Sequence, residues 1–266
     1  MSEILNKFKA ALIAGQKQYG IWNGIPHSYA AEILAGAGFD WVLIDAEHGP
    51  FSMDQIIIQL QAMSRYDVNP ILRMRNADPE YMKTLMDAGL QSFIIPKVES
   101  AETAETMVKA MRYPPEGTRG VGTALARAAQ WNRVNNYFQD ANQHMCLIIQ
   151  IESVKGVEAL DEILQVEGVD VIFMGPADLA GSMGHLGNPG HKDVKTAVNN
   201  CLKKIVAAGK VPGVLTSSQK LIEEYTTQGA MMIGVGLDTI ILANATKELA
   251  EYYKPELKSK VSNTRY

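Results

Sequence analysis

The stretch CLIIQIES, residues 146–153, is an apolar run that ends in two polar groups, Gln150 and Glu152. A run this apolar is typical of a strand that is buried on both faces, as in the parallel sheets of α/β proteins. Because successive side chains of a strand point to opposite faces, Gln150 and Glu152 share one face and the neighbouring isoleucines share the other. A buried carboxylate without a partner costs several kcal/mol. Glu152 is therefore expected at a wet edge of the sheet, where a cation can reach it.

Similar apolar runs recur along the chain at fairly even spacing, with amphipathic segments between them. Residues 78–89 and 101–112, for example, begin with acidic residues, and the first ends at a glycine and the second in basic residues, as helices do. Strands that alternate with helices imply parallel pairing through right-handed crossovers. Eight such units, without a G-x-G-x-x-G after the first, favour a closed (β/α)8 TIM barrel over a Rossmann-like sheet. The eight runs are residues 19–24, 41–48, 70–74, 92–98, 146–152, 170–176, 211–216 and 231–238.

The length of 266 residues suits one barrel, so residues 1–266 are expected to form a single domain. The longest interruption, residues 113–145, is expected to be a lid, a binding loop or an oligomer contact. After about residue 240 the chain begins as an apolar helix and becomes charged. We expect this C-terminal helix either to cap the barrel or to pack on a neighbouring subunit.

Composition narrows the class of protein. The formal net charge is −4 and the chain has no run of basic residues, which argues against nucleic acid as a partner. The N-terminus lacks the apolar region of a signal peptide, and no stretch is long and apolar enough to span a bilayer. The two cysteines, Cys146 and Cys201, are interpreted as inert thiols. A cytoplasmic, soluble protein with no membrane partner is expected.

Polar residues cluster where the predicted strands end, which is the face where barrels of this kind hold their active sites. Glu152 and Asp178 are 26 residues apart, one βα unit, so they are expected on neighbouring strand ends. Two carboxylates without a nearby cysteine favour a hard divalent cation, Mg²⁺, Mn²⁺ or Co²⁺, over a structural Zn²⁺. The alternative for Glu152 is a buried ion pair with Arg73 or a lysine, and for Asp178 a helix N-cap.

Three further features suggest roles in catalysis. DAEHG (45–49) places His48 beside carboxylates, the arrangement of a general base, although a lone histidine at a strand end is more often structural. Either Arg73 or Arg75 could stabilise an oxyanion. The turn in GPADL (175–179) has free backbone N–H groups that can bind a carboxylate.

Two other segments indicate rival chemistries. Lys97, at the end of the fourth run, could form a Schiff base in a metal-free aldolase. GVGLD (234–238) resembles the glycine-rich turn that binds phosphate in many barrels, although its glycines could serve only a tight turn.

The assembled motifs strongly resemble the class II pyruvate aldolases of the HpcH/HpaI family over about residues 4–250. The motifs that match in order and spacing are WVLIDAEHGP, YPPEGTRGVGTALARAAQWNRV, QIES, EGVDVIFMGPADLAGSMGHLGNP and PGVLT. The resemblance implies a TIM barrel with an exchanged C-terminal helix, in a homo-hexamer built as a trimer of dimers. It implies a metal-dependent lyase that reversibly cleaves 4-hydroxy-2-oxo acids to pyruvate and an aldehyde such as succinic semialdehyde, with 4-hydroxy-2-oxoheptane-1,7-dioate as the expected substrate, in aromatic compound catabolism.

The same resemblance assigns residues to roles. It places the divalent metal on Glu152 and Asp178 and gives no catalytic role to Lys97. The segments 122–134 and 183–191 are expected to shape the aldehyde pocket. Catalysis is assigned to His48, Arg73, Asp45 and, in a neighbouring subunit's site, Asp87; substrate binding is assigned to Arg73, Gln150, Gly175, Ala177, Asp178 and Leu215.

Other functions remain open on the sequence alone. Within the family these are a 2-dehydro-3-deoxyglucarate-type sugar-acid aldolase and a citrate-lyase-like acyl-CoA lyase, although no basic groove for coenzyme A is evident. Outside it they are a phosphate-binding isomerase and a non-catalytic barrel that binds a metal or a 2-oxo acid.

Overall fold

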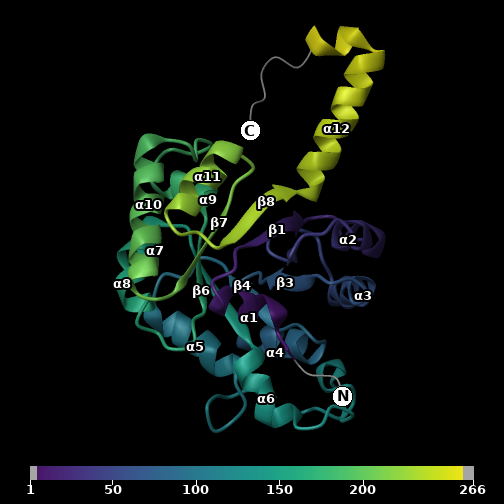
Figure 1. The fold of residues 1–266 in the computed structure, drawn as a ribbon, viewed down its shortest axis with the longest axis vertical. Coiled ribbons are helices and arrows are strands. Elements are labelled where there is room, and N and C mark those ends of the chain that lie inside the picture. The colour runs from purple at the N-terminus through teal and green to yellow at the C-terminus, as the bar shows by residue number, and fades with distance from the viewer. Residues whose placement is uncertain (1–4, 260–266) are drawn as a thin grey trace.

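The computed structural model describes residues 5–259, and eight parallel strands close into a barrel in the order of the sequence (Figure 1). The predicted TIM barrel is therefore confirmed. Each apolar run contains one strand, and each strand pairs in parallel with its neighbours along the chain, β8 closing on β1. The strands are Gln18–Asn23 (β1), Trp41–Asp45 (β2), Asn69–Arg73 (β3), Ser92–Ile95 (β4), Cys146–Ile151 (β5), Val171–Met174 (β6), Val211–Leu215 (β7) and Met232–Leu237 (β8).

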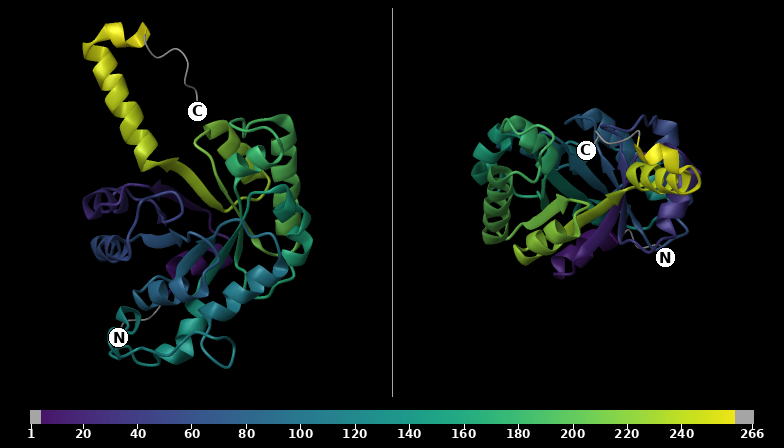
Figure 2. Two further views of the ribbon diagram at one scale, coloured as in Figure 1. Left: turned by 180° about the vertical axis from the view of Figure 1, so that it is seen from behind. Right: turned by 90° about the horizontal axis from the view of Figure 1, so that it is seen from above.

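Helices connect the strands and surround the barrel (Figures 1 and 2). Local sequence explains where they begin: Ser52 and Gln55 form a capping box at α3, and Asp78 caps α4 with a proline following it. The helices are Lys7–Ile13 (α1), Ser28–Ala35 (α2), Met53–Met63 (α3), Pro79–Asp87 (α4), Ala101–Met111 (α5), Tyr137–His144 (α6), Val154–Glu158 (α7), Leu160–Ile163 (α8), Pro176–Ser182 (α9), Lys192–Ala207 (α10), Gln219–Thr227 (α11) and Asp238–Tyr253 (α12), with 3₁₀ turns at Arg127–Ala129 (η1) and Pro255–Ser259 (η2).

Two apolar clusters meet at the strands. One lies between strands and helices and includes Ile149 and Ile151, while the other fills the barrel interior and includes Ile148. Residues Phe8 and Leu12 of α1 belong to the interior cluster. The alternation along β5 thus places Ile148 inside the barrel, and Gln150 and Glu152 follow on the same face. This periodicity is what brings two polar side chains to the carboxyl end of an apolar strand.

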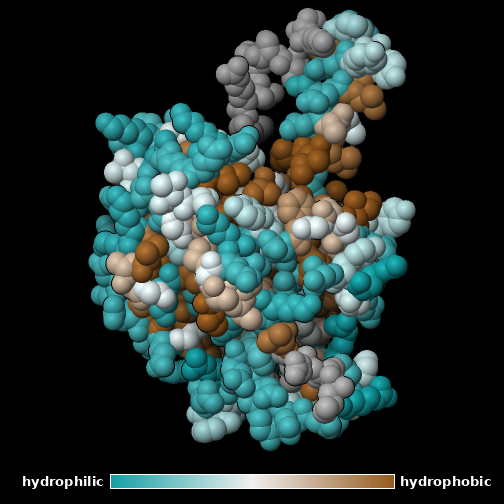
Figure 3. All heavy atoms as spheres, in the orientation of Figure 1, coloured by the Kyte–Doolittle hydropathy of each residue, from teal (hydrophilic) through white to brown (hydrophobic). Residues whose placement is uncertain are grey.

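The interruption at 113–145 contains η1 and α6 around a small cluster of its own that includes Tyr113 and Tyr137. The C-terminal helix is present as α12, which extends away from the barrel in Figure 1 and in the left view of Figure 2. Apolar side chains gather at its base, where Ile240, Ile241 and Leu242 are about half exposed (Figure 3). Among residues 5–259, no helix combines the length and the apolar character needed to cross a membrane.

Both cysteines are free and buried. Burial raises the pKa of the Cys201 thiol to about 11 and that of Cys146 well above its usual value. Thiolates are thus disfavoured at both positions, in agreement with inert thiols.

Candidate active site

A cavity of about 580 Å³ opens at the carboxyl ends of the strands and collects side chains from seven of the eight βα units. It is the end of the barrel at which enzymes of this fold bind substrates. Its lining is mixed and includes charged groups, hydroxyls, leucines and aromatic rings. The lining residues are Trp22, Asp45, His48, Arg73, Gln150, Phe173, Gly175, Pro176, Ala177, Asp178, Pro189, Leu215, Thr216, Ser217, Leu221, Tyr225 and Leu237.

One group of charges at the cavity consists of Asp45, Glu47 and Arg73, here called the Arg73 group. Arg73 donates from Nε and Nη2 to the two oxygens of Asp45, at 2.9 and 2.5 Å, and its Nη1 lies 3.1 Å from Oε2 of Glu47. Burial alone would lower the pKa of Arg73, but the bonds and charges of Asp45 and Glu47 outweigh it and raise that pKa. A bidentate pair fixes the guanidinium in position. Two N–H groups, one on each Nη, remain for another acceptor.

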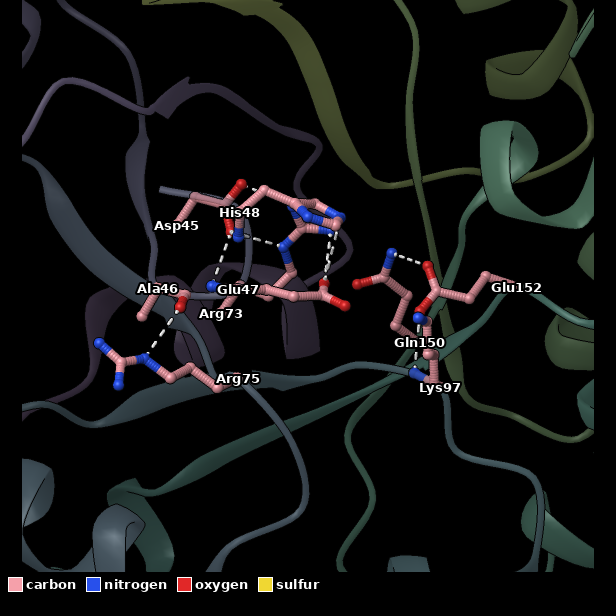
Figure 4. Close-up of polar contacts among 9 residues, drawn as sticks. All are labelled: Asp45, Ala46, Glu47, His48, Arg73, Arg75, Lys97, Gln150 and Glu152. Carbon is pink, nitrogen blue, oxygen red and sulfur yellow. Dashed lines mark hydrogen bonds and ion pairs between the residues drawn. The ribbon is translucent and has the colours of Figure 1, made fainter. Parts of the chain in front are cut away.

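The second group lies across β5 and α9 and consists of Gln150, Glu152 and Asp178, here called the Glu152 group. Figure 4 shows Gln150 and Glu152 apart from the Arg73 group, with Gln150 Nε2 donating to Glu152 Oε2 at 2.5 Å. The backbone N–H of Lys97 donates to the other oxygen of Glu152 at 2.9 Å. Lys97 has φ of 52°, so a sparsely populated backbone conformation presents that N–H.

The Glu152 carboxyl lacks a full counter-charge. Glu152 is 3% exposed, and burial raises its pKa to about 7, with the negative charges of Asp178 and Glu47 adding to the effect. The Lys97 N–H and the more weakly felt Arg73 charge act in the opposite direction. A buried carboxyl with a raised pKa beside other carboxylates is a frequent property of functional sites.

Gly175 makes the close approach of β5 and α9 possible. A Cβ there would lie 2.7 Å from Oε2 of Glu152 and 3.0 Å from Nε2 of Gln150. Gly175 is also the N-cap of α9, and Ala177 and Asp178 lie in the first turn of that helix, beside the cavity. The N–H groups of a first turn have no carbonyl partner within the helix.

His48 follows β2 and its side chain is 63% exposed, with Nε2 3.9 Å from Oε2 of Glu47. Asp45 accepts from the backbone N–H of His48 at 3.3 Å, while its carboxylate is held by Arg73. The carboxylate beside the imidazole is thus Glu47, at a distance longer than a hydrogen bond. The imidazole lines the cavity.

The residues of the Glu152 group fit a divalent metal. The donors that could hold it are the carboxylate oxygens of Glu152 and Asp178. Burial, and after it the charges of Asp178 and Glu47, raise the pKa of Glu152, and a bound cation would offset both effects. An all-oxygen donor set suits Mg²⁺ or Mn²⁺.

Arg75 and Lys97 do not contribute side chains to the cavity. Arg75 donates to the backbone oxygens of Ala46 and Phe51, on the far side of the chain from Arg73 (Figure 4). The Lys97 side chain is exposed, so a Schiff base there has no support. Of the two arginines considered for the oxyanion, Arg73 is thus the one whose side chain lines the cavity.

GVGLD also has a structural explanation. The Asp238 carboxylate accepts from the backbone N–H groups of Gly24 and Ile25, at 2.8 and 3.0 Å, which joins the ends of β8 and β1. A Cβ on Gly234 would lie within 3 Å of Leu215 and Trp22, so this glycine serves close packing.

Asp87 lies outside the cavity, at the end of α4. Its Oδ1 accepts from Nη2 of Arg119 at 2.9 Å, and the Arg119 side chain is fully buried over the ring of Tyr113. Of the two segments expected to shape the aldehyde pocket, 183–191 contributes Pro189, whereas 122–134 contributes no lining residue. Asp87 and residues 122–134 therefore do not line the cavity of their own chain.

Sequence reasoning did not identify Arg119 or the apolar lining, including Trp22 and Phe173. The alternation of β1 and β6 could have placed those two rings inside the barrel, where they pack 5.5 Å apart. Arg119 gave no signal, because one arginine in a glycine-rich loop looks like any exposed arginine.

Comparison with known proteins identifies the family. The HpcH/HpaI aldolase/citrate lyase profile matches residues 18–245. This chain belongs to the HpcH/HpaI aldolase/citrate lyase family. It is accordingly an enzyme of the aldolase type, a lyase, as the resemblance in sequence predicted.

Individual relatives cover nearly the whole chain. A 4-hydroxy-2-oxo-heptane-1,7-dioate aldolase of Shigella sonnei is 48% identical over 245 residues, 92% of this chain and 94% of its own. The enzyme of that name from Salmonella heidelberg is 47% identical over 253 residues, 95% and 96% of the two chains. Among solved structures, a family member from Burkholderia cenocepacia has a TM-score of 0.89 at 34% identity, covering 94% of this chain and 99% of its own. Citrate synthase SbnG has a TM-score of 0.84 at 30% identity and covers 96% and 99%.

Proposed function

We propose that this protein is a divalent-metal-dependent aldolase that cleaves 4-hydroxy-2-oxo acids to pyruvate and an aldehyde, with 4-hydroxy-2-oxoheptane-1,7-dioate as its substrate. The relatives that share almost half of its residues carry the name of that activity. The observation that carries the proposal is Glu152, a buried carboxyl next to the cavity wall, whose pKa is raised by burial and by the charge of Asp178, which lines the cavity.

Glu152 and Asp178 would hold the metal, Mg²⁺, Mn²⁺ or Co²⁺, with Zn²⁺ as a further candidate. A bound divalent cation supplies Lewis acidity toward the keto oxygen of a 2-oxo acid. Ala177 and Asp178 would bind the substrate carboxylate through the backbone N–H groups at the start of α9. Gly175, Gln150 and Leu215 would complete the pocket around the three-carbon unit that becomes pyruvate.

The proton steps are assigned to His48. In the cleavage direction its imidazole accepts the proton of the 4-hydroxyl group, the C3–C4 bond breaks, and the electron pair moves to the C2 oxygen as an enolate. Arg73 has two N–H groups left to donate to that oxygen and is held in place by Asp45. Protonation at C3 then gives pyruvate, and the former C4 leaves as the aldehyde.

We also propose that the active assembly contains several copies of this chain, as a homo-hexamer arranged as a trimer of dimers. The half-exposed apolar residues at the base of α12 support packing against another copy. Asp87 lies outside its own chain's cavity, and in an assembly it would contribute to a neighbour's site. Light scattering on the purified protein tests the number of copies.

The function is tested by measuring pyruvate release from 4-hydroxy-2-oxo acids of different tail lengths. The seven-carbon dioate is expected to give the highest kcat/KM. A higher value for hydroxylated sugar acids would assign a sugar-acid aldolase, and activity that required an acyl-CoA would assign a citrate-lyase-like enzyme. Inactivation by borohydride in the presence of pyruvate would indicate a Schiff base and contradict the metal-dependent chemistry.

A further inference from the structure

Two histidines and an aspartate come together at the junction between α9 and α10, outside the cavity lining. His185 lies in the connecting loop, His191 is the N-cap of α10, and Asp193 lies in the first turn of that helix. The two imidazole rings are stacked with centroids 3.6 Å apart. His185 Nε2 lies 3.6 Å and His191 Nδ1 3.8 Å from the same oxygen, Oδ2 of Asp193.

These distances are longer than hydrogen bonds, so the three side chains do not satisfy one another directly. They are close to the spacing of ligands around a metal: bonds of about 2.0–2.2 Å in a tetrahedral site place donor atoms about 3.3–3.6 Å apart. One donor atom from each of the three residues lies within 4.8 Å of the others. Within residues 5–259, this is the place where three or more such donors gather so closely.

We propose that His185, His191 and Asp193 form a second cation site, selective for zinc-like divalent ions. Imidazole nitrogen suits Zn²⁺, Ni²⁺ and Cu²⁺, whereas the all-oxygen corner at Glu152 and Asp178 suits harder ions. Three protein ligands leave a fourth position for water. The site stands independently of the proposed function, because none of its three residues lines the cavity.

Two features of the loop favour binding before any ion arrives. Asn188 donates its backbone N–H to the carbonyl of His185 at 2.9 Å, and its own carbonyl accepts from the N–H of His191 at 3.0 Å. The two ring-bearing residues are thereby held on the same side of a short turn. Because the turn is already ordered, less conformational entropy of the loop is lost when the ion binds.

The stacked rings, 17° from parallel, would have to tilt for the nitrogen lone pairs of both to meet at one ion. Two further features oppose binding, and both are compensated. The N-terminus of a helix disfavours a cation, but the Asp193 carboxylate supplies a negative charge in that first turn. Nδ1 of His191 also accepts a hydrogen bond from the Asp193 backbone N–H at 3.3 Å, so the same atom already caps α10 through a long hydrogen bond. Coordination through Nδ1 would exchange this weak cap for a metal bond.

A cation bound by these three residues would link the loop that follows α9 to the start of α10. Pro189 lies between the two histidines and lines the cavity. An ion at this site would therefore stabilise a segment beside the active site without taking part in the reaction. Zn²⁺ would raise the melting temperature through this site even when the barrel mouth cannot bind it.

The test is calorimetric titration of Zn²⁺ into untagged, metal-stripped chain carrying Glu152→Ala and Asp178→Ala, with thermal melting in parallel. About one Zn²⁺ per chain is expected, with an increase in melting temperature. Adding His185→Gln is expected to weaken Zn²⁺ binding more than about tenfold, since even the loss of an outer-shell partner costs that much. His191→Asn is expected to do the same while preserving the helix cap, because asparagine is a preferred N-cap.

His27→Asn is the matched control. His27 caps α2 through the same kind of contact, from the Tyr29 N–H at 3.1 Å, but belongs to no such cluster, so Zn²⁺ affinity should not change. A second experiment uses a chain with His185→Gln as its single substitution and an intact barrel mouth. This chain should bind one Zn²⁺ ion fewer than the parent chain. Zn²⁺ binding that survives both His185→Gln and His191→Asn would overturn the proposal. So would a failure of the Glu152→Ala, Asp178→Ala chain to bind Zn²⁺ together with an unchanged number of bound Zn²⁺ ions when His185→Gln is introduced alone.

Discussion

The two groups of charges at the barrel mouth differ in how the negative charge of their carboxylates is compensated. In the Arg73 group, two carboxylates are matched by a guanidinium that contacts both of them. In the Glu152 group, Glu152 receives only neutral N–H donors, and burial together with nearby carboxylates raises its pKa to about 7. The first group contains a cationic side chain of its own, whereas Glu152 is bound only by neutral donors, which leaves its charge for a metal ion to neutralise.

The largest effect is expected from Arg73→Ala, which would leave the Arg73 group as poorly compensated as the Glu152 group. Removing one partner of a buried pair costs about 3–5 kcal/mol of unfolding free energy, and the oxyanion donor is lost as well. Urea denaturation and turnover measure the two effects. Arg65→Ala is the control, since it breaks an exposed pair with Glu32 worth at most about 1 kcal/mol. Equal destabilisation by both substitutions would contradict the account.

His48→Ala is expected to lower kcat about 10²–10⁴-fold, as for loss of a general base, with little change in stability because the side chain is largely exposed. Metal affinity should be unchanged, which separates His48 from the Glu152 group. Steady-state kinetics and metal titration check this. A kcat equal to that of the parent enzyme would remove His48 from the mechanism, and His27→Asn serves as a control outside the cavity.

Stability of the metal-free protein is expected to depend on pH through Glu152. Its pKa is about 7 in the folded chain against 4.5 ordinarily, so the folded state binds the proton more tightly. This contribution is fully present below about pH 4.5 and is lost as pH rises through 7, a difference of about 3 kcal/mol. Urea denaturation at pH 5 and pH 8 should show it in the parent chain and not in Glu152→Gln. Saturating Mg²⁺ should suppress it, and identical pH profiles for the two chains would contradict the assignment.

Gly175→Ala tests the close approach that the Glu152 group requires. The added Cβ would lie 2.7 Å from Glu152 Oε2, and overpacking of this kind costs about 1–3 kcal/mol. Gly122→Ala is the control, because a Cβ there meets no atom within 4 Å. Thermal unfolding should separate the two variants, and equal melting temperatures would show that the close approach is not required.

The same contrast explains what the sequence could predict. Strand alternation placed Gln150 and Glu152 together at the end of an apolar strand, because period-two patterning survives in any barrel. Local sequence could not show that Arg73 binds Asp45 while Arg75 binds backbone carbonyls. The two arginines lie two residues apart and carry the same charge, so the sequence does not distinguish them. The backbone contact from Lys97 and the burial of Arg119 depend on long-range packing that no local pattern encodes.

The most direct measurement is Mn²⁺ binding, followed by electron paramagnetic resonance, to metal-stripped parent chain and to Glu152→Gln, with pyruvate release measured in the same samples. Mn²⁺ is used because it is the weakest of the first-row ions for nitrogen ligands. The parent chain is expected to bind Mn²⁺ and to recover activity with it, and Glu152→Gln is expected to lose both. Equal Mn²⁺ affinity in the two proteins, or full activity of the metal-stripped parent chain, would contradict the assignment of Glu152 as a metal ligand that activity requires.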